Sequence, residues 1–173
     1  MRSGSRGLVS RIAAGIALLL ASCGPAVPPS SPHELLEKTP EPATRALLDG
    51  TVTAIPASGK VTLVDFWSLS CAPCLEALPG LDKLWRDADR GAVAFVGVAV
   101  DDDSYAVERK IAELGVTFPQ TIDDGFVLKG RYRVASVPAT FVLDRQGRIR
   151  YFTADALADM ERIADAIAAL AAE

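Results

Sequence analysis

The sequence predicts an α/β domain in which helices flank a central mixed β-sheet. Two runs of strand length, Val61–Trp67 and Ala92–Val100, are continuously apolar and rich in β-branched and aromatic residues, as strands buried on both faces are. Near the C-terminus, Ala139–Leu143 and Arg148–Phe152 flank the turn Asp144–Gly147, which predicts an antiparallel hairpin. Helical segments between the strands imply crossover connections, and therefore helices on both faces of the sheet.

The first 22 residues are typical of an export signal and not of a folded element. Three arginines precede Ile12–Ala21, an apolar run that is too short to span a bilayer as a stable helix. Leu20-Ala21-Ser22-Cys23 resembles the bacterial lipobox, which implies that Cys23 becomes the first mature residue and carries a lipid. The alternative is a plain signal peptide with an incidental cysteine. We expect an exported chain, lipid-anchored to a bacterial membrane, with its domain facing the periplasm or the cell exterior.

Removal of the signal changes the charge and the cysteine count. The full chain has 18 basic and 22 acidic residues; without three arginines it has 15 against 22, a net charge near −7. No basic block is present, which argues against a nucleic-acid partner. With Cys23 blocked, Cys71 and Cys74 are the remaining thiols, in a compartment that permits disulfides.

Residues 23–42 are rich in proline and serine and predict an extended, semi-rigid tether. The single histidine, His33, lies in it and is expected to be solvated. The domain is predicted over residues 43–173. Near its start, residues 46–60 predict one or two short strands punctuated by the turns Asp49-Gly50 and Ser58-Gly59.

Four further segments complete the element order. A helix follows Cys71, another is expected over residues 101–115, and a short strand within 115–124 leads to a brief helix near 125–133. An amphipathic helix over 154–172 closes the chain, with an apolar face made by Leu157, Met160, Ile163, Ala164 and Ile167.

The pair Cys71-Ala72-Pro73-Cys74 stands where the strand Val61–Trp67 passes into the first helix. The dipole and the free N–H groups at a helix N-terminus stabilise a thiolate and lower the pKa of a cysteine there. Cys74 lies one turn later, close enough to resolve a mixed disulfide, and Pro73 stiffens the turn without removing a needed donor. An inert disulfide would close a very short loop and stabilise little. A zinc site needs about four ligands, and only His33 and Cys23 remain as candidates.

These motifs in this order resemble the thioredoxin superfamily, and most closely its TlpA/ResA-like branch of membrane-tethered bacterial thiol-disulfide oxidoreductases. The resemblance is carried by VDFWSLSCAPC, FVGVAVD and YRVASVPATFVLDRQGRI and covers roughly Ala43 to Glu173. It implies a thioredoxin fold with an N-terminal strand extension and a β-α insert. It also implies that Cys71 and Cys74 form the redox disulfide, with Cys71 attacking and Cys74 resolving.

The resemblance implies roles for four supporting residues. Trp67 ends the strand before the pair, and Asp65 is a buried carboxylate that exchanges a proton as Cys74 reacts, unless it is paired with a lysine or a backbone donor. Pro138 is a cis-proline facing Cys71, unless it is a trans proline opening an edge strand. A cis-proline there would expose the backbone of Val137 for pairing with a substrate strand.

Three positions depart from the TlpA/ResA-like pattern. Ser70 stands where most relatives have tryptophan, and Ala77 stands where many have glutamate, with Glu76 one position off. Asp65 resembles thioredoxin itself, because much of the branch has asparagine there. The departures at Ser70 and Ala77 affect the choice of pathway more than the choice of reaction.

The implied function is reduction of disulfides in exported proteins, with electrons from a membrane thiol donor and no dissolved cofactor or metal. Apocytochrome c is one substrate that the family implies. A thiol peroxidase is an alternative, because Ser68 echoes the T-x-x-C pattern of peroxidatic sites, although Val64 replaces the accompanying proline. A non-catalytic binding or assembly module with the same fold is the other alternative.

Overall fold

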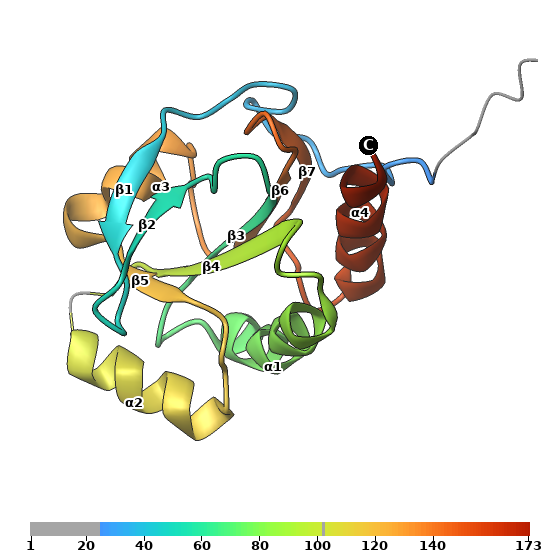
Figure 1. Cartoon of the computed structure of the whole chain (residues 1–173). Coiled ribbons are helices and arrows are strands. Elements are labelled where there is room, and N and C mark those ends of the chain that lie inside the picture. Colours follow the sequence, from blue (N-terminus) through green and yellow to red (C-terminus); the bar gives the residue numbers. More distant parts are fainter. Residues whose placement is uncertain (1–24, 102) are drawn as a thin grey trace, which may run out of the picture.

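A computed structural model describes residues 25–101 and 103–173, so the predicted signal peptide and Cys23 lie outside the described residues. Five strands form one mixed sheet in the order β5-β4-β3-β6-β7 (Figure 1). The parallel strands are β3 (Val61–Trp67), β4 (Val93–Ala99) and β5 (Gln120–Ile122). β6 (Ala139–Leu143) runs antiparallel to β3, and β7 (Ile149–Thr153) runs antiparallel to β6. The predicted mixed sheet and closing hairpin are confirmed.

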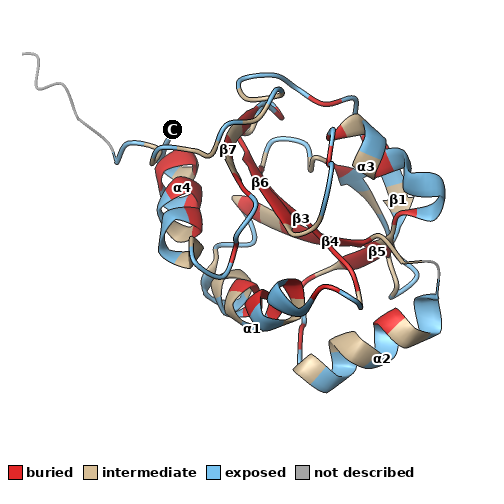
Figure 2. Cartoon of the chain, turned by 180° about the vertical axis from the view of Figure 1, so that it is seen from behind, coloured by how far each residue is buried: buried red, intermediate tan, exposed pale blue. Residues whose placement is uncertain are grey.

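Helices cover both faces of this sheet (Figures 1 and 2). α1 (Ala72–Asp87), α2 (Ser104–Leu114) and α4 (Met160–Ala172) pack with one core cluster, and α3 (Val127–Arg131) packs with a second cluster on the other face. A 3₁₀ turn, Asp124–Phe126, leads into α3. Between β4 and the closing hairpin lie α2, β5 and α3.

The central strand β3 is buried along its whole length, as its continuous apolar run predicts. Successive side chains of a strand point to opposite faces. Leu63 and Trp67 join the core under α1 and α4, whereas Val64 and Phe66 join the core under α3. Asp65 therefore points to the α1 face, between Leu63 and Trp67.

The last helix begins later than the sequence predicts. Asp155 accepts the backbone N–H of Ala158 at 3.0 Å, and the Thr153 hydroxyl donates to Asp159 at 2.7 Å, so these residues form a turn before α4. Leu157 lies in this turn and is 45% exposed instead of contributing to the apolar face. The buried face of α4 is made by Ile163, Ala166, Ile167, Ala169 and Leu170.

Part of the predicted tether is docked on the domain. The segment Ser30–Lys38, called the strap below, lies along the outer edge of β7: Ser31 N–H donates to the Phe152 carbonyl at 3.0 Å, and Ile149 N–H donates to the Lys38 carbonyl at 2.9 Å. The folded part of the chain thus begins before the boundary at Ala43 that composition suggested. The physical reason is that β7, as an edge strand, has unpaired backbone groups that the strap satisfies.

His33 is half-buried, whereas the sequence predicts a solvated side chain. Its ring centroid lies 5.0 Å from that of Phe141 and 4.5 Å from that of Phe152, within the range of favourable aromatic packing. Its Nδ1 accepts the N–H of Leu35 at 3.2 Å. The histidine therefore fastens the strap to the sheet.

The N-terminal strand extension covers the other edge of the sheet. β1 (Ala43–Ala46) and β2 (Val52–Ile55) form an antiparallel pair of their own. Leu48 N–H donates to the Gln120 carbonyl at 2.9 Å, and the Thr121 hydroxyl donates to the Ala46 carbonyl at 2.7 Å. Residues before β3 thus protect both sheet edges, β7 through the strap and β5 through the hairpin.

Deletion of the strap is expected to destabilise the domain. A chain starting at Ala43 should lose at least about 3 kcal/mol of unfolding free energy relative to one starting at Pro25, because several backbone hydrogen bonds of ~1 kcal/mol each and the histidine packing disappear. Urea unfolding of the two chains measures the difference. His33→Ala in the longer chain should show part of the loss, and equal midpoints for both chains would contradict the strap's structural role.

Candidate active site

Cys71 and Cys74 form a disulfide at the N-terminus of α1, with 5.2 Å between their Cα atoms. Cys71 is the N-cap residue: its backbone is extended, and its Sγ accepts the N–H of Cys74 at 3.3 Å. Pro73 occupies the first turn of the helix, where no backbone donor is needed. Cys71 is 9% exposed and Cys74 is 2% exposed, so Cys71 is the more accessible residue of the pair.

The loop that delivers Cys71 is fixed by short-range hydrogen bonds. Cys71 N–H donates to the Ser68 carbonyl at 3.1 Å, and the Ser68 and Ser70 hydroxyls lie 3.1 Å apart. The carboxylate of Asp101, just after β4, accepts the N–H of Leu69 at 3.0 Å. Ser70 is exposed. With serine in place of tryptophan, position 70 therefore places no large side chain beside the approach to the sulfurs.

The Val137–Pro138 peptide bond is cis, as predicted. It directly precedes β6, whose first residue, Ala139, is opposite Phe66 of β3. Because β6 runs antiparallel to β3, its N-terminal end lies beside the C-terminal end of β3, where the cysteine loop begins. The proline is thus placed on the β6 side of the cysteine pair.

Asp65 is a buried carboxylate. Its hydrogen-bond partner is neither the lysine nor the backbone donor that the sequence suggested. It is 3% exposed, and the hydroxyl of Thr140 donates to its Oδ1 at 2.6 Å. Among the described residues this hydroxyl is its hydrogen-bond partner, in place of a lysine or a backbone donor. Burial raises the pKa of Asp65 to about 7, although the bond from Thr140 acts in the opposite direction.

Trp67 is held by a buried polar network. Its indole N–H donates to Gln120 Oε1 at 3.0 Å, and the Gln120 amide donates to the Phe118 carbonyl at 3.2 Å. A Cβ on Gly97 would collide with Gln120 Oε1, so glycine at this position of β4 makes room for the amide. The network joins the end of β3 to the start of β5 across the glycine of β4.

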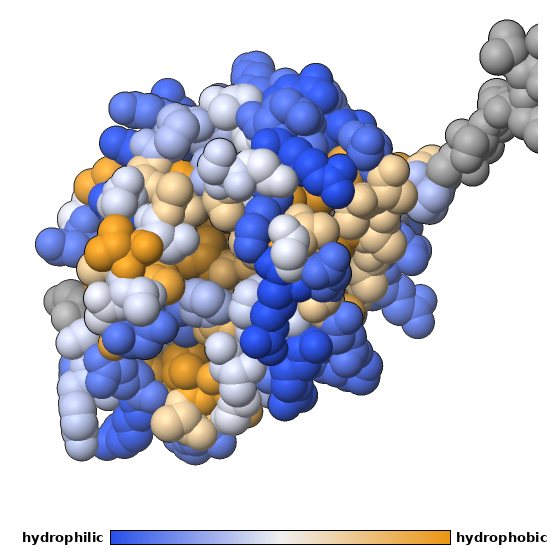
Figure 3. All heavy atoms as spheres, viewed as in Figure 1, coloured by the Kyte–Doolittle hydropathy of each residue, from blue (hydrophilic) through white to orange (hydrophobic). Residues whose placement is uncertain are grey.

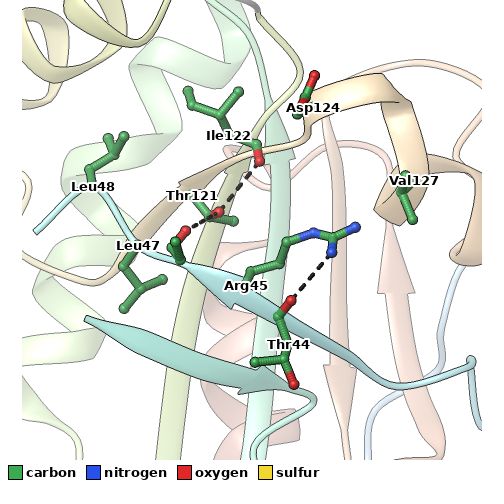
Figure 4. A pocket seen from close by; sticks show the side chains of 9 residues that line it. Thr44, Arg45, Leu47, Leu48, Thr121, Ile122, Asp124 and Val127 are labelled. Atoms are coloured by element: carbon green, nitrogen blue, oxygen red, sulfur yellow. Dashed lines mark hydrogen bonds between the residues drawn. The ribbon is translucent and has the colours of Figure 1, made fainter. Parts of the chain in front are cut away.

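One hollow in the described part of the chain lies away from the cysteines. It has a volume of about 620 Å³ and lies between β1 and the end of β5, with Thr44, Arg45, Thr121 and Ile122 among its lining residues (Figure 4). The Arg45 guanidinium donates back to the Thr44 carbonyl at 3.3 Å. None of the predicted site residues lines it, so the candidate chemistry lies elsewhere.

The comparisons with known proteins decide the family. A model described as the AhpC/TSA family matches residues 37–152. The chain belongs to the AhpC/TSA family. The match begins within the strap and ends in β7, so it includes the whole candidate site.

Relatives of this AhpC/TSA family member are named thiol-disulfide oxidoreductases. ResA of Bacillus anthracis is 29% identical over 91 residues, which are 53% of this chain and 53% of ResA. YkuV of Bacillus subtilis is 34% identical over 116 residues, 64% of this chain and 78% of YkuV. The chain spans about half the length of the ResA relatives it matches. The predicted resemblance to ResA-like proteins is confirmed.

Solved structures agree on the fold. StoA from Bacillus subtilis superimposes with a TM-score of 0.63 at 25% identity, covering 72% of this chain and 97% of StoA. A secreted Mycobacterium tuberculosis disulfide oxidoreductase gives a TM-score of 0.64 at 25% identity, covering 74% and 96%. These neighbours confirm the predicted thioredoxin-like fold for this member of the AhpC/TSA family.

At the position where many ResA-like relatives are expected to have glutamate, this family member has a buried residue. Ala77 is 3% exposed and packs in the core, while Glu76 is exposed one position away. Glu76, one position off, is thus not in the buried place that Ala77 occupies. Asp65 is therefore the buried carboxylate on the α1 face of the central strand.

Three contributing residues escaped the sequence analysis: Thr140, Gln120 and Asp101. Thr140 contacts Asp65 because the two residues are opposite each other in the β3–β6 register. Gln120 is opposite Gly97 in the β4–β5 register. A polar residue at an otherwise apolar strand position is the signal that could have drawn attention to Thr140 and Gln120, but their partners depend on the register.

Proposed function

We propose that this AhpC/TSA family member is an exported thiol-disulfide oxidoreductase that reduces disulfides of other exported proteins through Cys71 and Cys74. One observation carries the proposal: Cys71 caps the N-terminus of α1 while Cys74, one turn later, is within disulfide reach. The names of ResA and YkuV support the reaction class.

The reaction follows from this geometry. In the reduced protein the Cys71 thiolate, favoured by the helix N-terminus, attacks one substrate sulfur and releases the other as a thiolate. Cys74 then attacks Cys71 Sγ, which frees the second substrate sulfur and closes the Cys71–Cys74 disulfide. The pair loses two electrons, and the substrate gains two electrons and two protons. A membrane thiol donor regenerates the reduced pair, and no dissolved cofactor or metal takes part.

Asp65 is assigned the role of accepting the thiol proton of Cys74 during the second step. It lies on the α1 face of β3, the face on which Cys74 is buried, and its pKa of about 7 suits proton exchange at neutral pH. Thr140 keeps the carboxylate oriented. Trp67 and its network support the loop, and Pro73 keeps the turn between the cysteines rigid.

The substrate disulfide approaches past the cis-proline. Pro138 and Val137 lie beside the end of β3, and Val137 is half-buried, so its backbone groups are available at the start of β6 for pairing with an extended substrate segment. Apocytochrome c, whose thiols must be reduced before haem attachment, is one such substrate.

The membrane attachment is assigned to a lipid on Cys23, with residues 1–22 removed as a signal peptide. In the described part of the chain no helix is long and apolar enough to cross a membrane. Val27 packs against the core, and Cys23 lies only four residues earlier, so the anchor can extend at most about 14 Å from that contact. The Val27 contact, together with the strap, thus makes the effective tether much shorter than the Pro/Ser-rich segment predicts.

The decisive experiment traps the intermediate. In an exported Cys74→Ser variant the second step is blocked, so substrates should remain joined to Cys71 and appear as adducts that dithiothreitol releases. Pull-downs followed by non-reducing and reducing gels measure these adducts, and Cys71→Ser is the matched control without them. Complete absence of reducible adducts contradicts the oxidoreductase. Peroxide turnover that depends on Cys71 would instead favour a thiol peroxidase.

The anchor has its own test. Cys23→Ala should move the protein from the membrane fraction to the soluble fraction, because the lipid would be lost. Membrane fractionation with immunoblotting measures the change, and Cys74→Ser, which keeps Cys23, should remain with the membrane. A wild-type protein found entirely in the soluble fraction would contradict the lipid anchor.

A further inference from the structure

A second hollow lies at the same sheet edge as the cysteine loop. It has a volume of about 390 Å³ and is called the acidic hollow below; its lining residues are Val100, Asp101, Ile122, Asp123, Asp124, Gly125 and Phe126. These residues lie at or directly after the C-terminal ends of β4 and β5. Because β3, β4 and β5 are parallel, their C-terminal ends share one edge of the sheet, and neighbouring strands are about 5 Å apart.

Two hydrogen bonds join the acidic hollow to the cysteine loop. Val100 N–H donates to the Trp67 carbonyl at 2.9 Å, and Leu69 N–H donates to the Asp101 carboxylate at 3.0 Å. Leu69 lies two residues before Cys71. The hollow is therefore one to two strand spacings, ~5–10 Å, to the β4 side of the strand that delivers Cys71, whereas Pro138 lies on the β6 side.

The lining combines apolar surface with acidic groups. Val100 and Ile122 are half-buried, and the Phe126 side chain is 57% exposed. Gly125 and Phe126 have φ values of 66° and 56°, so consecutive left-handed residues form the turn that presents this ring. In Figure 3, whose view is that of Figure 1, the surface is largely polar, with a group of apolar atoms near β1 and α3.

The three aspartates of the acidic hollow differ in their hydrogen-bond partners. Asp123 is buried and accepts the N–H groups of Leu128 and Lys129 at 2.8 and 2.7 Å, so its charge serves the start of α3. Asp101 uses Oδ2 for the cysteine loop. Asp124 is exposed, and within the described residues its carboxylate has no hydrogen-bonded partner. The nearby cation is Lys129, whose Nζ lies 5.4 Å from the Phe126 ring centroid.

We propose that the acidic hollow is a specificity subsite that binds a lysine or arginine side chain flanking the substrate disulfide; this inference rests on the proposed function. The aliphatic stem of such a side chain matches Val100, Ile122 and Phe126, and its cationic head matches Asp101 and Asp124. A substrate strand that pairs at Val137 and crosses Cys71 continues toward β4 and β5. Exposed Ser70 places no large side chain in that path.

The subsite is tested with disulfide-bonded peptides that differ in one residue. Lysine or glutamate is placed at the second or third residue from the reacting cysteine, because a strand rises about 3.3 Å per residue and the acidic hollow is ~5–10 Å away. The reduced, soluble Cys23→Ala protein should reduce the lysine peptide with a kcat/KM about tenfold above that of the glutamate peptide. The ratio should shrink as salt is raised, since exposed charges are screened.

Matched variants test whether the preference for the lysine peptide arises at the acidic hollow. Asp124→Lys should bring the ratio to one or below, and Phe126→Ala should lower the rate for the lysine peptide. Asp165→Lys changes an exposed acid on α4 by the same charge and should keep the wild-type ratio. Circular dichroism confirms that each variant is folded, and Asp124→Asn provides a milder change that should give an intermediate ratio.

The outcomes separate this inference from the proposed function. Equal rates for the two peptides in the wild type, or an unchanged ratio in both Asp124→Lys and Asp124→Asn, overturn the subsite while leaving the oxidoreductase intact. A wild type that reduces neither peptide, together with no adducts to Cys74→Ser, overturns the proposed function itself.

Discussion

Cys71→Ser is expected to abolish disulfide reduction, with turnover at least about a thousandfold below that of the wild type. A serine hydroxyl at this position does not ionise at neutral pH, whereas the helix N-terminus favours the thiolate that attacks disulfides. The N–H of Cys74 that points to Cys71 Sγ would remain, so the fold of the loop should persist. Turnover of an insulin disulfide or of the lysine peptide, with dithiothreitol as electron donor, measures the loss.

The two cysteines should behave differently in a single encounter. Cys74→Ser is expected to form one adduct per molecule at a near wild-type rate and then stop, because Cys71 is the more exposed residue of the pair and the resolving thiol is missing. Cys71→Ser should form no adduct. Mass spectrometry of the protein after mixing with a disulfide peptide separates the cases. A Cys71→Ser variant that still forms adducts through Cys74 would reverse the assignment of attacking and resolving residues.

Local sequence patterns predicted most of the fold. Continuous apolar runs located β3 and β4, helical spacing located α1 and α2, and the turn Asp144–Gly147 located the hairpin. These features depend on residues that are close in the sequence. The strap is not predicted by composition. Its proline and serine content indicates how the segment behaves by itself, whereas the backbone groups of β7 that hold it are more than a hundred residues away in the sequence.

The same distinction applies to the site. Cys71, Pro73 and Cys74 lie within one helical turn, so a short motif identifies them. The partner of Asp65 does not follow from the motif, because Thr140 is 75 residues away and becomes a neighbour only through the β3–β6 register. Phe126 could not be singled out either, since an aromatic residue in a short apolar segment is usually part of the core. Its exposure depends on the left-handed turn at Gly125.

Asp65→Asn is expected to stabilise the oxidised protein at neutral and alkaline pH. The pKa of Asp65 is raised by burial from 3.8 to about 7, so between these pH values the folded protein holds one proton more than the unfolded chain. Stability therefore falls as pH rises through this window, by about 1.4 kcal/mol per pH unit and about 4 kcal/mol in all. Asparagine carries no charge and keeps an oxygen for the Thr140 hydroxyl, so the variant should lack this decline.

Urea unfolding at pH 4 and pH 8 measures the effect with both proteins oxidised. The two should be nearly equally stable at pH 4, and the variant should be about 2–4 kcal/mol more stable at pH 8. Parallel stability profiles would show that Asp65 has an ordinary pKa in the folded protein. The variant that gains stability should also resolve the mixed disulfide more slowly, by about a hundredfold in single turnover. The reason is that the Asp65 carboxylate, which destabilises the fold, is also the group that we propose takes the proton of Cys74. If the variant gains stability and resolves at the wild-type rate, the buried charge has no part in the reaction, and water must carry the proton instead.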